Sequence, residues 1–205
     1  MSSFLLVQGN SVPNLEGIAE GYCIRDCNTF FHIIINVSAE NIERVFCSLC
    51  ACVREPGFLL LEHGTNRKME EELRTKDTDP FHKDVYYLDG LTTESLLQLM
   101  APYMGLLVND GEINFGFGSH QGTDEVFVGP YKIFNVYSNE PQKYEEILLD
   151  HGYQQSEPLK TVWETFTEET PGGRMCVTRD GLDIYQMVEQ LQEKGLYLAE
   201  RRADK

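Results

Sequence analysis

Segments with the composition of β-strands alternate with amphipathic helical segments along this chain. Residues 30–37, rich in Ile and Phe, have the β-branched and aromatic content of a buried strand. Directly after them, residues 39–53 place apolar side chains at the spacing of one helix face, namely Ile42, Val45, Phe46, Leu49 and Val53. Elements with one apolar face have to bury that face against another element. The alternation therefore predicts an α+β fold with a hydrophobic core.

The order of the expected elements predicts two tandem units. In the first half, strands and helices follow one another as βαββαβ, the arrangement of ferredoxin-like folds. Its strands are expected at 30–37, 58–62, 85–88 and 112–118, and its helices at 39–53 and from Thr92, where Pro102 would interrupt the second. The highly charged residues 65–76 are expected to form an additional, solvated helix. The second half has a similar order, with strands expected at 124–128, 131–137, 162–167, 175–178 and 196–199 and helices from Asn139 and from Asp180 or Asp183.

We therefore predict an N-terminal extension and hairpin arm at residues 1–29, a first unit at 30–120 and a second unit at 121–205. Segments 162–167 and 175–178 are expected to pair as a hairpin within the second unit. The two halves share no strong sequence identity, so the repeat is one of topology. The same elements allow an alternative: one continuous, mostly antiparallel sheet with helices on one face.

An excess of acidic side chains argues against two classes of partner. The chain has 33 Asp and Glu against 17 Lys and Arg, which gives a formal net charge of −16. Nucleic acids and anionic membranes would face a protein of their own sign, so we expect neither as a partner. Hydrophobic residues make up 41% of the chain, which is typical of a globular rather than a disordered protein.

The first residues and the apolar runs predict a cytoplasmic protein. The N-terminal segment has no positively charged region and only a four-residue apolar run, which does not suit a signal peptide. No apolar run approaches the roughly 18 residues of a transmembrane helix. In the reducing cytoplasm the six cysteines are expected to be free thiols.

Two cysteine pairs have spacings compatible with a zinc site. Their four members, Cys23, Cys27, Cys47 and Cys50, are the alternative metal ligands. Cys47, Cys50 and Cys52 would share one helix but point in different directions, so these three cannot converge on one ion. Buried cysteine is also common as a small apolar side chain. We therefore expect neither a metal nor a cofactor.

No motif for a nucleophile elbow, a phosphate loop or a zinc protease occurs in the chain. The glycines at 116–122 have the spacing G-x-G-x-x-x-G and precede a strand, whereas a dinucleotide site needs G-x-G-x-x-G before a helix. In ferredoxin-like units His63 and His120 would end parallel strands at opposite edges, ~14 Å apart. The alternative function is an enzyme or small-ligand binder whose inter-unit cleft is lined by His63, His120, Asp124 and Glu125.

The acidic residues are unevenly distributed along the sequence. Residues 84–131 contain seven Asp and Glu and no Lys or Arg, and several aromatic residues occur among them. Aromatic anchors inside an acidic rim suit an interface with a basic protein. The residues predicted to bind this partner are Asp110, Glu112, Phe115, Phe117, Asp124 and Glu125.

Together these features predict a non-enzymatic module that binds a basic protein partner. Its size, its acidity and its lack of catalytic motifs are similar to those of toxin-neutralising immunity proteins, which is an analogy of composition rather than of motif. The sequence leaves the identity of the partner and the oligomeric state open.

Overall fold

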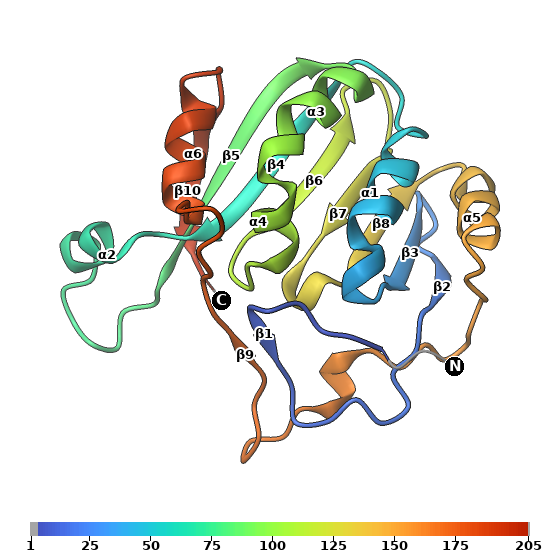
Figure 1. Cartoon of the computed structure of the whole chain (residues 1–205), viewed down its shortest axis with the longest axis horizontal. Helices are drawn as coiled ribbons and strands as arrows, with labels where there is room; N and C mark the ends of the chain where they lie inside the picture. Colours follow the sequence, from blue (N-terminus) through green and yellow to red (C-terminus); the bar gives the residue numbers. More distant parts are fainter. Residues whose placement is uncertain (1–3, 205) are drawn as a thin grey trace.

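An eight-stranded sheet runs through the centre of the molecule. The computed structural model describes residues 4–204. The strands are β2 (Gly21–Asp26), β3 (Phe31–Asn36), β4 (Gly57–Gly64), β5 (His82–Leu91), β6 (Asn114–Ser119), β7 (Glu125–Val128), β8 (Phe134–Ser138) and β10 (Tyr197–Ala203). Their order across the sheet is β10-β5-β4-β6-β7-β8-β3-β2, and every neighbouring pair is antiparallel (Figure 1).

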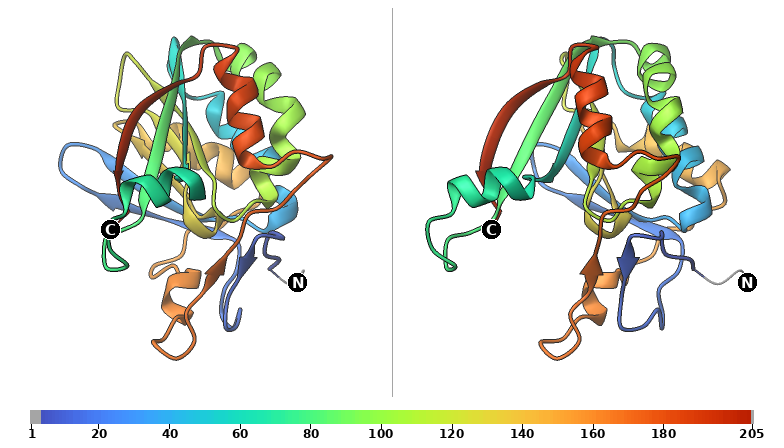
Figure 2. Two further views of the ribbon diagram at one scale, coloured as in Figure 1. Left: turned by 90° about the vertical axis from the view of Figure 1, so that its left-hand side faces the viewer. Right: turned by 60° about the vertical axis from the view of Figure 1, so that its left-hand side comes forward.

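Helices pack against one face of this sheet. They are α1 (Ile42–Cys50), α3 (Thr93–Met100), α4 (Met104–Asn109), α5 (Pro141–Asp150) and α6 (Ile184–Gln192). Figure 2 shows α1, α3, α4 and α6 on the same side of the strands. Their apolar side chains meet alternate strand residues, and Leu59, Leu61, Phe115, Phe117 and Val126 are completely buried between the two layers. Helix α2 (Arg67–Leu73) projects from the end of the β4–β5 pair (Figure 1).

The structure contains one continuous sheet, which is the alternative prediction, rather than two tandem ferredoxin-like units. Strands β6, β7 and β8 form a meander that inserts between β4 and β3. Strand β10, at the end of the predicted second unit, pairs with β5 of the first. Strands from residues 30–120 and from residues 121–205 are therefore interleaved in one sheet. The helix-and-strand pattern is the same for both topologies, and only the pairing distinguishes them.

Most individual elements lie where the sequence predicts them. The helix expected from Thr92 is divided, as predicted, near Pro102: α3 and α4 are separated by a 3₁₀ turn, η2 (Ala101–Tyr103). The predicted strand at 131–137 begins later, because residues 130–132 form the turn η3 (Pro130–Lys132). Among the described residues, no helix is both long and apolar enough to cross a membrane.

The predicted hairpin of 162–167 with 175–178 is wrong. The first segment contains a 3₁₀ helix, η4 (Val162–Thr165), which Thr161 and Glu164 close with a reciprocal capping box. Near the second segment only β9 (Gly173–Arg174) is extended, and it pairs with β1 (Asn10–Ser11) at the N-terminal side of the molecule. The capping box is visible in the sequence as Thr-x-x-Glu and would have indicated a helical turn there.

Candidate functional site

The sheet face opposite the helices, here called the open face, carries aromatic side chains. Side chains alternate along a strand, so the neighbours of the core residues point to this face. It presents Phe58, Tyr87, Phe127 and Tyr137, all half-buried, together with the more deeply buried Leu60 and Val85. Figure 2 shows the twist of the sheet and this face on the side away from α1, α3, α4 and α6. An uncovered apolar face of this kind is typical of an interaction site.

Two glycines lower the middle of the open face. Strand β6 alternates Phe115 and Phe117, which enter the core, with Gly116 and Gly118, which face outward. The Phe58 ring lies against Gly118, where a Cβ atom would collide with it. The floor of the open face is therefore backbone at these positions, and side chains from the strands on either side border it.

Two hollows lie side by side on the open face. The larger, of about 390 Å³, is lined by Phe30, Phe58, Ser119, Gly122, Thr123, Asp124, Glu125 and Tyr137. The smaller, of about 240 Å³, is lined by Leu60, Glu62, Val85, Tyr87, Glu125, Phe127, Tyr137, Glu200 and Arg202. Glu125 and Tyr137 line both hollows and thus stand between them.

Aromatic contacts hold the walls of the larger hollow in place. The Tyr137 ring stacks on His32, with ring centroids 4.7 Å apart, and meets Phe30 edge-on at 5.8 Å. On the other side, the Phe58 ring contacts Tyr87 at 5.4 Å. Such pairs each contribute about 0.5–1.5 kcal/mol beyond simple burial. The two rings that face the hollow are therefore positioned before any ligand arrives.

Glu125 is the one open-face carboxylate that lacks a partner within residues 4–204. Glu62 pairs with Arg202, and Asp89 pairs with His120 at 3.0 Å. Glu125 is half-buried, and no hydrogen bond or ion pair to its carboxylate occurs among the described residues. Burial raises the pKa of this carboxyl above its usual value. A desolvated carboxylate of this kind gains most from an incoming cation.

The six residues predicted to bind a partner do not form one surface in the structure. Phe115, Phe117 and Asp110 are completely buried, so they offer nothing to a partner. Asp124 accepts a hydrogen bond from Ser138 and pairs with Lys143 at 2.7 Å on the helix side. Glu112 lies 3.8 Å from Arg174. Of the six predicted residues, Glu125 alone presents an unpaired side chain on the open face, while Asp124 borders the larger hollow there with its carboxylate already engaged.

The four residues of the predicted catalytic cleft do not converge. Strands β4 and β6 are adjacent and antiparallel, not parallel at opposite edges, so the predicted strand arrangement is wrong. His63 lies at one end of this pair and His120 at the other, roughly 20 Å away along the strands. Asp124 turns to the helix side whereas Glu125 points to the open face.

The alternative zinc ligands lie on different sides of the sheet. Cys23 borders a small hollow on the open face. Cys50 lies on α1, on the other side of the sheet, and is buried in the core. Residues 4–204 contain no group of three or more His, Cys, Asp or Glu side chains that could hold a metal ion.

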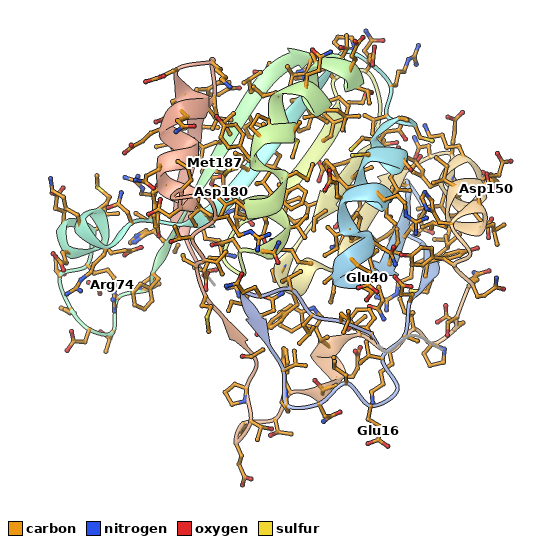
Figure 3. The ribbon with its side chains drawn as sticks, in the orientation of Figure 1. Glu16, Glu40, Arg74, Asp150, Asp180 and Met187 are labelled. Atoms are coloured by element: carbon orange, nitrogen blue, oxygen red, sulfur yellow. The ribbon has the colours of Figure 1, made fainter. Side chains whose placement is uncertain are left out.

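A larger hollow of about 620 Å³ lies between α2 and the loop that follows it, where Arg74 is labelled in Figure 3. Its lining carries charges of both signs, and some of these side chains are engaged within α2 and the loop. Arg67 pairs with Glu71, while Arg74 donates to the Asp77 and Asp79 carbonyls.

The sequence indicates Tyr137 as one of the aromatic residues of the predicted interface, whereas Phe58 was missed, although strand patterns point to both. The run Phe115-Gly-Phe-Gly118 places two rings on one face of a strand and two glycines on the other, which predicts a lowered outer surface. The alternation through β8 likewise puts Tyr137 opposite the core residue Val136. No protein-family model, curated protein or solved structure was found to match the chain.

Proposed function

We propose that this protein is a non-enzymatic binding module that docks a basic segment of a partner protein on its open face. The observation that carries the proposal is the unpaired Glu125 carboxylate, set between aromatic walls on the sheet face opposite α1, α3, α4 and α6. The toxin-inhibitor form of this function remains a narrower proposal, in which the partner is a basic toxin.

The chemistry of the open face favours a protein segment as its ligand. Tyr and Phe side chains that are already half-buried provide large contact areas at little cost in side-chain entropy. The two adjoining hollows can accept successive side chains of an extended segment. A net charge of −16 would steer a basic partner toward the molecule and raise its association rate.

A defined peptide tests the proposal. The probe is a dodecapeptide of alternating Arg and Leu, and its control replaces every Arg with Glu. The ¹⁵N-labelled protein is titrated with each peptide, and the shifted amides are mapped. We expect the basic peptide alone to shift amides of β4, β6, β7 and β8. Shifts confined to the helices, shifts spread over the whole acidic surface or the absence of binding would each contradict the proposal.

A pair of variants separates the open face from general charge attraction. Tyr137→Ala removes a wall of both hollows and should weaken binding of the basic peptide by about tenfold or more. Leu149→Ala truncates an exposed apolar side chain on α5 and should leave binding unchanged. Equal weakening in both variants would show that the peptide does not recognise the open face.

A further inference from the structure

The 390 Å³ hollow of the open face, here called the Glu125 hollow, combines flat aromatic walls with a single free carboxylate. Glu125 pairs across the strands with Gly118 on one side and with Tyr137 on the other. Because Phe58 lies on Gly118, the carboxylate has an aromatic ring toward each neighbouring strand. No Lys or Arg lines this hollow, in contrast to the smaller one, which contains Arg202.

We propose that the Glu125 hollow is a subsite for one arginine side chain of the partner, an inference that rests on the proposed function. In it the guanidinium group stacks on the Phe58 and Tyr137 rings and forms paired hydrogen bonds to the Glu125 carboxylate. Arg is planar, carries a fork of donors that matches a carboxylate, and stacks on aromatic faces.

Two considerations favour arginine over lysine as the occupant, and a third observation shows that Glu125 is the only carboxylate the hollow offers to it. An ammonium ion is compact and strongly hydrated, so it loses more on entering a half-buried aromatic site than a guanidinium does. The walls offer ring faces and edges already fixed by His32, Phe30 and Tyr87, which suits stacking of a planar group. Asp124, although it borders the hollow, is already engaged by Ser138 and Lys143 and does not provide a second carboxylate.

The electrostatics of Glu125 agree with this occupant. Burial raises the pKa of its carboxyl, which means that the charged form lacks stabilisation in the free protein. A bound guanidinium would supply that stabilisation and move the pKa of Glu125 downward again. Binding should therefore be coupled to deprotonation of this one side chain.

Small cations test the subsite without the rest of a partner. The probes are N-ethylguanidinium, n-butylammonium and the uncharged N-ethylurea, and binding is followed by the amide shifts of residues 118, 125 and 137. We expect N-ethylguanidinium to bind about tenfold more tightly than n-butylammonium, and N-ethylurea to bind still more weakly. Equal binding of the two cations would overturn the arginine assignment, and equal binding of N-ethylurea would overturn the role of charge.

Matched variants locate the binding. Glu125→Gln keeps the shape of the side chain and should abolish N-ethylguanidinium binding, while Glu43→Gln changes an exposed carboxylate on α1, on the other side of the sheet, and should not. Gly118→Ala should displace the Phe58 ring and weaken binding, whereas Gly64→Ala adds a methyl group in open space and should not.

The two proposals fail in different ways. If the Arg-Leu peptide binds the open face but Glu125→Gln leaves both peptide and N-ethylguanidinium affinity unchanged, the arginine subsite is wrong while the docking surface stands. If the peptide does not bind the open face in the wild-type protein, the proposed function itself is wrong.

Discussion

His63 is a buried imidazole whose two nitrogens have unequal surroundings. Its Nδ1–H donates to the Gly64 carbonyl at 2.8 Å, which fixes the neutral tautomer. Its Nε2 is buried and has no hydrogen-bond partner among the described residues. The ring lies between Tyr86 and Tyr185, at centroid distances of 5.4 and 5.3 Å. Protonation would therefore place an unpaired N–H and a charge in an apolar setting.

This environment predicts an acid-sensitive contribution to stability. Burial lowers the pKa of His63, although the Gly64 hydrogen bond and the Asp84 and Asp110 charges act in the opposite direction. The unfolded chain then binds this proton more readily, so the free energy of unfolding falls as the pH drops below the ordinary pKa of about 6.5. His63→Phe keeps the ring stack and removes the titration. Its free energy of unfolding should decline less than that of the wild type between about pH 7 and pH 5.

Urea denaturation at several pH values measures this decline. His120→Gln changes an exposed histidine and should not reduce it. Parallel pH profiles for His63→Phe and the wild type would show that His63 does not account for the acid sensitivity.

Single residues differ in how far the sequence determines their roles. The outward glycines and inward phenylalanines of β6 follow from simple alternation. Asp110 shows the limit, because its carboxylate accepts hydrogen bonds from the backbone N–H groups of Ile113 and Val177. No local sequence pattern indicates the contact with Val177, which lies 67 positions away. The sequence therefore predicted Asp110 as a surface residue, whereas its carboxylate joins two segments of the chain.

At the scale of elements, strand β10 closes one edge of the sheet with charged residues. Arg201 bonds to the buried Asp84 on the neighbouring strand β5, and Arg202 reaches past β5 to pair with Glu62 on β4. A register shift between Leu198 and Glu200 bends the strand. Charged side chains and a bulge are the devices that keep an edge strand from pairing with another chain. This edge is therefore protected against strand addition, so the proposed partner is expected on the open face instead.

The Arg201–Asp84 ion pair, which joins β10 to β5, is expected to contribute substantially to the free energy of unfolding. Burial on its own would raise the pKa of Asp84, but hydrogen bonds from Arg201 and Thr65 outweigh it and keep the pKa below its usual value. Arg201→Gln would leave this carboxylate without its cation and should lower the free energy of unfolding by about 3 kcal/mol. Chemical denaturation at neutral pH measures the change.

Arg67→Gln is the matched control, because Arg67 forms an exposed pair with Glu71 on α2 and should matter little. An equally small loss in Arg201→Gln would mean that Asp84 finds water or Thr65 a sufficient substitute.

The existence of most elements could be predicted, whereas the strand order could not. Helix α6 shows both an apolar stripe and an N-cap at Asp183, which are local features. The pairing of β10 with β5 joins residues 110 to 121 positions apart, from Tyr197 with Tyr87 to Ala203 with His82, and no short-range pattern specifies it. The insertion of the β6–β7–β8 meander between β4 and β3 is likewise not specified by any short-range pattern.

At the scale of the whole molecule, the interleaved strands predict a single cooperative unfolding transition. Strand β8 pairs with β3 and β7, and β10 pairs with β5, so neither residues 30–120 nor residues 121–205 contain a complete sheet. Differential scanning calorimetry should give a calorimetric enthalpy close to the van't Hoff enthalpy. Two resolved transitions, or a stably folded fragment of residues 121–205, would contradict this expectation.

The division of each strand between core and open face has a consequence for the divergence of this protein. In β4, Leu59 and Leu61 serve the core while Phe58 and Leu60 face outward, and the same separation holds in β7 and β8. Mutations at the outward positions leave the packed layer untouched. Drift at alternate codons could therefore change the chemistry of the open face, and with it the proposed binding specificity, while the scaffold is inherited unchanged.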